Sequence, residues 1–318
     1  GKDMKTALVI GIGGNFGLQM AHALRAQGWR VNALLRHASK APAWLTADQI
    51  HIGSARDKAS VAQAAKGADL IVYAANPQYH RWHEEALPML EPVVQVAQEL
   101  GARILFPGNV YNFTPTDQSI SESHSMQAPT DKGDIRIQME ARLLNASQQG
   151  AKVTLVRAGD FLGEQMQMSW LDYMLKGKNG QYKLSMPHDD QHVHYWSYLP
   201  DLCANAVKLV ENAQSDFDVW HDPGFALRTR DWQEAFAANG WTVKTGAFPW
   251  WVFRLIAPFN PMLREVFKMR YLWQQPVVMD GSKMCAALGA QRRQTDFSNI
   301  VAGMVERSLH TTAQLKQA

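Results

Sequence analysis

Cysteine is nearly absent from this sequence. The 318 residues include two cysteines, Cys203 and Cys285, and neither stands in a CxxC or metal-ligand spacing. The sequence therefore offers no disulfide framework and no cysteine-based metal centre, which indicates a reducing compartment. We expect that compartment to be the cytoplasm. Internal repeats and low-complexity tracts are missing as well, so nothing points to a solenoid or a disordered array.

Long apolar runs and an excess of one charge are also missing. A membrane-spanning helix needs roughly 18 uninterrupted apolar residues, and the nearest candidate, 247–267, is interrupted by Arg254, Arg264 and three prolines. The first apolar run belongs to a predicted strand, so we expect no secretory signal peptide. The net charge of +3 is not concentrated in a basic run, which argues against nucleic-acid binding. We expect a soluble protein with neither a membrane nor a nucleic-acid partner.

The most specific signal that is present lies in segment 6–17, which reads Thr-Ala-Leu-Val-Ile-Gly-Ile-Gly-Gly-Asn-Phe-Gly. Its apolar half predicts a buried strand, and helical periodicity follows the glycines. Gly11 permits a tight turn, Gly14 lets a pyrophosphate approach the backbone, and Gly17 lets the helix lie close to the sheet. In this position a dinucleotide-binding turn is favoured over a plain strand-to-helix turn. The predicted cofactor contacts here are Gly11, Gly14, Asn15, Phe16 and Gly17.

Strands and helices alternate through the first half of the sequence. Apolar runs predict strands at 6–10, 30–35, 49–52, 69–75, 103–106 and 152–156. Helical periodicity lies between them, at 18–26, 58–66, 84–100 and 132–148. Strands separated by helices of this length predict an α/β fold with a doubly wound parallel Rossmann sheet, in which ligands bind at the carboxyl ends of the strands.

The regularity weakens after about residue 160. Segments 181–186 and 192–196 resemble strands, and 199–212 resembles a helix that returns to the sheet. Eleven tryptophans, many of them in the second half, indicate either a wall around a bulky ligand or simple core filling. Without a Gly/Ser linker, a lobe grown from the loops is favoured over an independent domain. We predict an NADP-binding Rossmann domain over 1–160, rejoined by 190–220, and a smaller substrate-binding lobe over most of 161–318.

The residue after the second strand predicts which dinucleotide binds. An acidic side chain there would accept hydrogen bonds from the adenosine ribose of NAD. The sequence instead runs from Leu35 into Arg36, whose guanidinium can pair with a phosphate. This pattern favours NADP over NAD, although an exposed arginine after a strand is also common. After the fourth strand, the small residues Ala74, Ala75 and Asn76 leave room for the middle of a dinucleotide, or serve only for packing.

In the order of its motifs, the chain resembles the short-chain dehydrogenase/reductase superfamily, in its extended or atypical branch of epimerases and dehydratases. The resemblance covers nearly the whole chain and rests on the glycine turn and on segments 106–111, 157–163, 194–201 and 280–289. It implies a Rossmann core, a bound nicotinamide dinucleotide and a C-terminal lobe that selects the substrate. It also implies that the nicotinamide lies near Ala75, Asn109 and Phe161. Ala158 and Asp160, in the segment after the sixth strand, are further cofactor contacts that the resemblance implies.

The catalytic residues of that family are replaced in this sequence. The family's Tyr-x-x-x-Lys pattern falls on Lys132 and Arg136, and its Ser or Thr after the fifth strand falls within 107–109 (Pro-Gly-Asn). Lys132 and Arg136 still share one helix face, where they could contact the cofactor or an anionic substrate, or simply face solvent. A lysine of pKa about 10.4 would need burial and a cationic neighbour to act as an acid or base. We predict Lys132, Arg136 and Tyr111 as catalytic residues, with Lys132 also contacting the cofactor.

Histidines offer further candidates. His80 and His83 follow the fourth strand, and a histidine near pKa 6.5 is a natural proton shuttle, although each has an equally good structural explanation. Alternation predicts His192 and His194 on one face of a strand. No third ligand is implied, so we expect no metal site.

These patterns leave more than one function open. The leading hypothesis is an NADP-dependent oxidoreductase or epimerase that acts on a carbonyl or alcohol of a small, sugar-like substrate. The alternative is a non-catalytic sensor or regulator that binds NADP(H). A methyltransferase with a similar glycine turn is disfavoured by Arg36, which stands where a ribose-binding acid is expected. Trp250 and the apolar segment after it could form a homodimer interface or a substrate lid.

Overall fold

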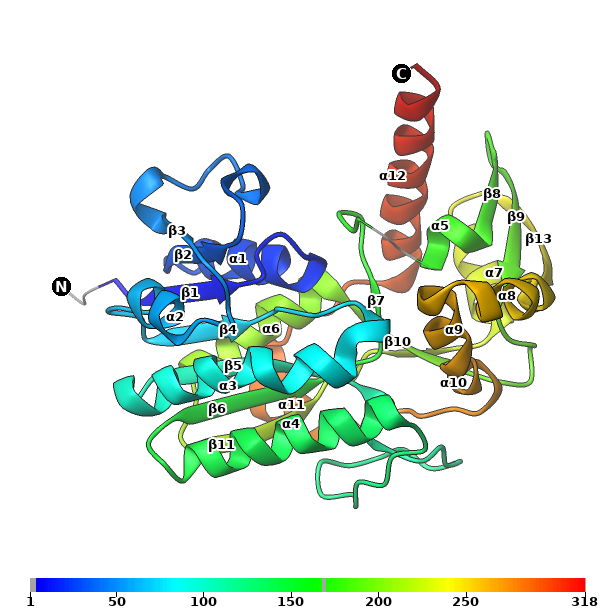
Figure 1. Cartoon of the computed structure of the whole chain (residues 1–318). Helices are drawn as coiled ribbons and strands as arrows, with labels where there is room; N and C mark the ends of the chain where they lie inside the picture. The colour runs from blue at the N-terminus through cyan, green and yellow to red at the C-terminus, as the bar shows by residue number, and fades with distance from the viewer. Residues whose placement is uncertain (1–3, 168–169, 318) are drawn as a thin grey trace.

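A seven-stranded sheet organises the chain, whose computed structural model describes residues 4–167 and 170–317 (Figure 1). All neighbouring strands in it are parallel, in the order β11-β6-β5-β4-β1-β2-β3. This arrangement confirms the predicted doubly wound α/β fold. The order of the strands along the chain reverses between β1 and β4, and such sheets bind ligands at that switch point. The strands are β1 (Thr6–Ile10), β2 (Arg30–Leu35), β3 (Ile50–Ile52), β4 (Leu70–Tyr73), β5 (Arg103–Gly108), β6 (Lys152–Arg157) and β11 (Phe217–His221).

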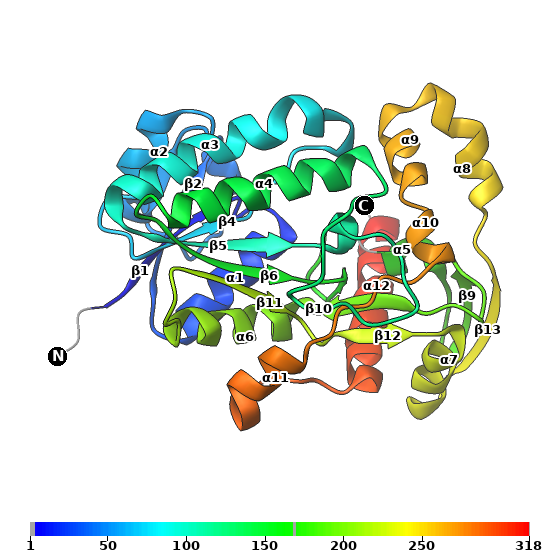
Figure 2. The ribbon, with the colours of Figure 1, turned by 90° about the horizontal axis from the view of Figure 1, so that it is seen from below.

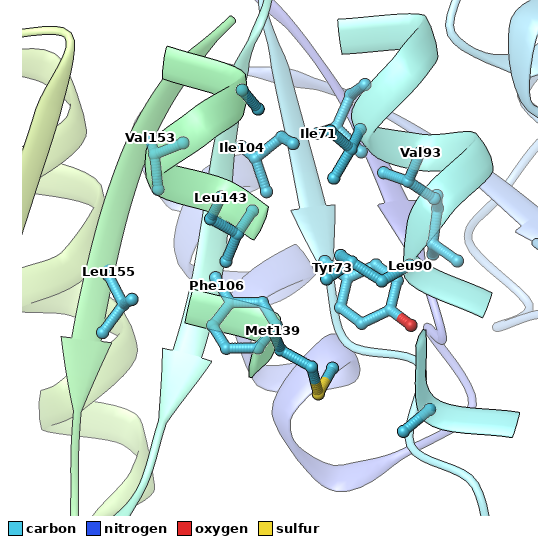
Figure 3. Close-up of a cluster of buried hydrophobic side chains, with 14 of the residues drawn as sticks. Ile71, Tyr73, Leu90, Val93, Ile104, Phe106, Met139, Leu143, Val153 and Leu155 are labelled. Atoms are coloured by element: carbon cyan, nitrogen blue, oxygen red, sulfur yellow. The ribbon is translucent and has the colours of Figure 1, made fainter. Parts of the chain in front are cut away.

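Helices cover both faces of this sheet (Figure 2). On one face, α1 (Asn15–Ala26) packs against α6 (Leu199–Glu211); the other face carries α2 (Lys58–Ala64), α3 (Trp82–Leu100) and α4 (Asp131–Ser147). Alternate strand residues such as Ile71 and Ile104 meet Leu90 of α3 and Leu143 of α4 in a fully buried core (Figure 3). The strands are therefore apolar on both faces, as a parallel sheet between two helical layers requires.

Three differences between the predicted and the observed strands have local causes. β4 ends before Ala74, because the backbone there passes so close to Gly11 that a Cβ on Gly11 would lie 2.6 Å from the Ala74 carbonyl carbon. The strand expected at 192–196 is β10 (His194–Tyr198), since His192 bonds Asp189 (Nδ1 to Oδ1, 2.6 Å) in the preceding turn. The edge strand β11 was not predicted, because its half-buried Phe-Asp-Val-Trp-His sequence lacks a long apolar run.

The C-terminal lobe is built from two small sheets and several short helices. β7 (Asp160–Leu162), β10 and β12 (Phe225–Leu227) form one sheet; β8 (Leu175–Lys178), β9 (Gln181–Met186) and β13 (Thr242–Ala247) form the other. Its core is aromatic: Trp196, Trp232 and Trp273 are each at most 3% exposed, so these tryptophans fill the core. The helices are α5 (Trp170–Met174), α7 (Thr229–Ala238), α8 (Trp250–Ile256), α9 (Pro261–Lys268), α10 (Tyr271–Gln274), α11 (Ser282–Leu288) and α12 (Phe297–Gln317).

Across residues 4–167 and 170–317, no helix combines the length and apolar character needed to cross a membrane. Cys203 is buried, Cys285 is partly buried, and both are free thiols.

Candidate active site

A cavity of about 250 Å³ lies at the carboxyl ends of β4, β5 and β6. Its walls come from the ends of these strands, from the residues that follow them, and from α1, α3 and α4. This is the place that the switch point of a doubly wound sheet predicts. Most of the predicted cofactor contacts and two of the predicted catalytic residues meet there. They are Phe16, Ala74, Ala75, Asn76, Asn109, Ala158, Asp160 and Phe161, together with Tyr111 and Arg136.

The glycine turn has the shape that a dinucleotide needs. Gly11 has a φ of +92°, and a Cβ on Gly17 would overlap the carbonyl group of Gly11, so α1 starts directly against the turn. A Cβ on Gly14 would instead meet its nearest protein atom, the carbonyl oxygen of Gly11, at an ordinary 3.5 Å. The protein itself therefore does not require glycine there. Gly14 is the N-cap of α1 and offers no side-chain hydrogen bond, which leaves the first N–H groups of the helix available to a phosphate.

Two other predicted cofactor contacts lie outside the cavity. The Asn15 side chain accepts a hydrogen bond from the Gln167 backbone N–H (2.9 Å), and the Gln167 side chain donates to the carbonyl of Gly13 (3.1 Å). Arg36 follows β2 and is exposed. A second basic residue, Lys40, comes near the turn: a Cβ on Gly13 would lie 3.8 Å from the Lys40 Cβ. Sequence reasoning missed Lys40, although its position four residues after Arg36 was visible.

Arg136 brings a buried positive charge to the cavity wall. Its Nη2 donates to the carbonyl of Pro107, and its guanidinium lies 4.7 Å from the ring centre of Phe106 and 5.8 Å from that of Trp82. Its Nε is buried without a hydrogen-bond partner among the residues that the structure describes. Burial lowers the pKa of Arg136, and the carboxylate of Glu140 opposes that effect. Arg136 nevertheless lines the cavity, so its positive charge favours a ligand with an acceptor oxygen.

Lys132 lies beside the cavity and does not line it. Its side chain is 2% exposed, and its ammonium pairs with the carboxylate of Glu265, which Lys268 also contacts at 3.0 Å. Burial would raise the pKa of Glu265, but the hydrogen bonds from Lys132 and Lys268 outweigh it and lower the pKa. Both Lys132 and Arg136 are buried, so the interpretation as a solvated helix face is wrong. Lys132 also lies 5.6 Å from the ring centre of Tyr79.

Two tyrosine hydroxyls meet on the cavity wall. Tyr111, after β5, and Tyr79, on the short helix η3 (Tyr79–Arg81), are joined by a 2.5 Å hydrogen bond between their oxygens. Burial raises the pKa of both phenols, but this hydrogen bond lowers the pKa of Tyr79 and raises that of Tyr111. Either hydroxyl can be the donor, and one of the two arrangements has Tyr111 donating to Tyr79. The proton of Tyr79 is then free for a ligand, and the charge of Arg136 lowers the Tyr79 pKa further.

A carboxylate and an imidazole lie close together beside Tyr111. His194 Nδ1 lies 3.1 Å from the carbonyl oxygen of Leu272, so Nδ1 must carry a hydrogen. Its Nε2 lies 2.5 Å from Oδ2 of Asp160, and that contact needs one proton from either partner. The His194 ring stacks on Trp273 with ring centres 3.4 Å apart, which fixes its orientation. Sequence reasoning singled out Asp160 but missed this partner, because β7 and β10 lie side by side only in the folded chain.

The other histidine candidates lie away from the cavity. His80 and His83 are exposed, and His83 bonds Asp131 on the surface (Nε2 to Oδ2, 2.8 Å). His192 precedes β10 and does not share its strand with His194, so the predicted common face is wrong. Within the described ranges 4–167 and 170–317, no three or more His, Cys, Asp or Glu side chains are grouped to hold a metal ion.

Comparison with known proteins agrees with this geometry. Residues 11–162 match the family model described as NAD(P)H-binding. The chain is similar in structure to the UDP-glucose 4-epimerase of Thermus thermophilus in complex with NAD, with 16% identity, a TM-score of 0.69, and coverage of 95% of this chain and 98% of that one. The search of curated proteins found no match.

Two further solved structures share the fold. A putative epimerase from Burkholderia cenocepacia is 15% identical with a TM-score of 0.73, over 97% of this chain and 99% of that one. The dTDP-glucose 4,6-dehydratase of Streptomyces venezuelae, with NAD bound, is 18% identical with a TM-score of 0.69, over 95% and 96% of the two chains. At such identities the likeness concerns the fold and leaves the chemistry to be argued from the site.

Proposed function

Because the chain carries an NAD(P)H-binding domain over residues 11–162 and has the fold of the extended short-chain dehydrogenases/reductases, we propose that it is an NADP-dependent oxidoreductase or epimerase. Its substrate is a small molecule with a carbonyl or alcohol group. The observation that carries the proposal is the cavity in which the Tyr79–Tyr111 pair and Arg136 lie beside the predicted nicotinamide position. When bound, NADP(H) supplies or accepts the hydride.

In this proposal Tyr79 takes the place of the absent family tyrosine. In a reduction, the carbonyl carbon receives the hydride, and the carbonyl oxygen takes the proton of Tyr79 as its π electrons move onto it. Tyr111 donates to the phenolate that Tyr79 becomes, and the cations of Arg136 and Lys132 stabilise its negative charge. Oxidation of an alcohol runs through the same groups in reverse. Lys132 therefore acts as a fixed cation, and its pairing with Glu265 is compatible with that role.

The Asp160–His194 pair is a second proton carrier on the same cavity. An epimerase removes and returns a hydride or proton at one carbon and so benefits from more than one acid–base group. Asp160 is one third exposed while His194 is buried, so the carboxyl group is the member that can meet a substrate. We assign it the role of a supporting acid or base.

The cofactor, the substrate class and the compartment are parts of the proposal that have separate support. Arg36, with Lys40 nearby, supports NADP as the preferred dinucleotide. The structural neighbours named for UDP-glucose and dTDP-glucose support a sugar-like substrate. Free Cys203 and Cys285 support the cytoplasm as the compartment.

A turnover assay tests the proposal. The purified protein is mixed with NADPH and a panel of ketoses, aldoses and simple ketones, and the loss of reduced-nicotinamide absorbance is followed. We expect turnover with at least one substrate, a fall in kcat of about 10²–10⁴-fold in Tyr79→Phe, and an unchanged Kd for NADPH. Tyr173→Phe, a change at an exposed tyrosine of the C-terminal lobe, is the matched control.

The same assay addresses a second candidate, a non-catalytic sensor of NADP(H). Two observations favour it: Asn109 stands in the family's Ser/Thr segment, and Lys132 is already engaged by Glu265. NADPH binding without turnover on any substrate of the panel would support the sensor. A Tyr79→Phe variant that turns over as fast as the unmodified enzyme would remove Tyr79 from the catalytic scheme.

A further inference from the structure

An apolar surface protrudes from the C-terminal lobe at the turn between two helices. In α8, Trp251 is 68% exposed, Leu255 64% and Ile256 42%. Phe259, shortly after α8, is 88% exposed. Single exposed apolar side chains are common, but several large ones on one turn are typical of an interaction site. We call Trp251, Leu255, Ile256 and Phe259 the α8–α9 face.

The inward side of the same segment is firmly packed. Trp250 is 6% exposed, its indole N–H donates to the carbonyl of Pro187 (2.8 Å), and its ring contacts Phe248 and Phe267. Asn260 caps α9 by accepting from the N–H of Leu263 (3.2 Å). The packing of Trp250 and the cap of α9 therefore fix the backbone from which the outward apolar side chains project.

Basic residues surround the α8–α9 face. Segment 249–270 contains four basic residues and one acidic residue, a net charge of +3. Arg254 is exposed between Trp251 and Leu255, and Arg264 and Lys268 are exposed on α9. The acidic residue, Glu265, is paired with Lys132 and Lys268, so it does not offset the outer arginines.

The position of the segment leaves this face accessible. Figures 1 and 2 both show α8 and α9 on the side of the molecule away from β2 and α2. α9 also packs against η3, which carries Tyr79. α9 therefore connects the α8–α9 face to the wall of the cavity.

We propose that the α8–α9 face docks on the surface of a lipid bilayer that contains anionic lipids. Tryptophan, phenylalanine and leucine inserted at the headgroup level, with arginines at the same level, are the composition of interfacial helices. Segment 249–270 has a net charge of +3 and Arg254 is exposed within the apolar cluster, so the face is complementary to anionic headgroups. A second copy of the chain would instead bring the same positive charges together across a two-fold interface. This proposal replaces the sequence-based expectation of no membrane partner, and it does not depend on catalytic turnover.

Vesicle co-sedimentation tests the proposal with the 318-residue chain. We expect binding to vesicles of equal parts phosphatidylcholine and phosphatidylglycerol, weaker binding to phosphatidylcholine alone, and a loss of binding as salt screens the arginines. Phe259→Ser should lower the partition coefficient about ten-fold because a ring no longer inserts, and Arg254→Ser about five-fold. Leu100→Ser, which removes an exposed leucine (49%) from the end of α3, outside the α8–α9 face, should bind as the unmodified protein does.

Two results would overturn the proposal. One is the lack of Phe259-dependent binding to the anionic vesicles, whether the unmodified protein fails to bind or Phe259→Ser binds equally well. The other is a stable dimer in sedimentation velocity that Phe259→Ser dissociates, because a second copy would then be the occupant of the face.

Discussion

His221 and Asp222 are buried neighbours whose pKa values are shifted in opposite directions. Burial, with help from Arg157, lowers the pKa of His221 to about 4, and burial raises the pKa of Asp222 to about 6. The stabilising contribution of neutral His221 is lost as pH falls from its unfolded value of about 6.5 toward 4. The contribution of protonated Asp222 is lost as pH rises from about 4 toward 6. The two trends largely cancel over the same pH range.

Asp222→Asn should reveal the pH dependence that His221 gives to the free energy of unfolding. With the carboxyl group removed, the free energy of unfolding should fall by about 3 kcal/mol between pH 6.5 and pH 4, since each pKa unit is worth about 1.4 kcal/mol. Urea unfolding at both pH values, for the unmodified protein and for Asp222→Asn, measures the difference. Asp117→Asn, at an exposed site, is the control. Identical pH dependences for Asp222→Asn and the unmodified protein would refute the assignment.

Arg36 carries the predicted choice between the two dinucleotides. Arg36→Asp should reverse the NADP/NAD affinity ratio, with NADPH binding weakened at least about ten-fold, because a carboxylate repels the 2′-phosphate that the guanidinium attracts. Binding titrations with NADPH and NADH measure the ratio. Arg56→Asp, an exposed arginine after β3, should leave the ratio unchanged. If Arg36→Asp also leaves it unchanged, the preference does not come from Arg36.

At the scale of single residues, position after a strand was the useful signal. It brought Tyr111 and Asp160 into the list of candidates, the family's Tyr-x-x-x-Lys pattern added Arg136, and the structure gathers all three around one cavity. Tyr79 and His194 were not assigned to the site, because their roles depend on partners far away in the sequence. Tyr79 meets Tyr111 from another loop, and His194 meets Asp160 from a different strand.

The strand–turn–helix element at the start of the chain offers a paired test. Gly17→Ala should lower the free energy of unfolding by about 1–3 kcal/mol, because the new methyl group overlaps the Gly11 carbonyl. Gly14→Ala should leave the free energy of unfolding within about 0.5 kcal/mol, since its backbone is extended and its Cβ fits. It should nevertheless raise the Kd for NADPH at least about ten-fold, if a pyrophosphate approaches that position. Unchanged NADPH affinity in Gly14→Ala would show that the phosphates bind elsewhere.

At the scale of elements, the regular strand–helix units were predictable and the exceptions had local causes. The strand β2 begins and ends where periodicity placed it. β4 ends before Ala74 because the backbone of Ala74 passes close to Gly11. β11 was missed because an edge strand needs less apolar sequence than a central one. The short helices after residue 228 were beyond prediction, since each is too short for helical periodicity to be distinct.

At the scale of the whole molecule, an ion pair joins α4, which covers the Rossmann sheet, to α9 of the C-terminal lobe. Lys132 of α4 is 2% exposed and its partner Glu265 of α9 is 14% exposed. Glu265→Gln should lower the free energy of unfolding by about 3 kcal/mol, because it leaves the Lys132 charge buried without its partner. The double variant Lys132→Met/Glu265→Leu should recover most of that loss. Urea unfolding of the three proteins measures this, and equal stability of Glu265→Gln and the unmodified protein would refute it.

The same lysine connects stability with the predicted chemistry. Lys132→Met removes a cation near the ring of Tyr79 and should lower kcat about ten-fold or more, with little change in the Kd for NADPH. Comparison of kcat and Kd in the turnover assay separates this effect from misfolding. Intact activity in Lys132→Met would remove Lys132 from the catalytic residues. The pairing with Glu265 could not be predicted from the sequence, since the two residues are separated by 133 positions.

The central claim is that the cavity at the strand ends holds the nicotinamide end of NADP(H), and a fluorescence titration tests it most directly. Trp82 lines the cavity, so energy transfer from tryptophan to bound NADPH should accompany binding. The account predicts a saturable signal with one NADPH per chain, and weaker binding of NADH. The absence of a saturable signal with both NADPH and NADH would contradict it.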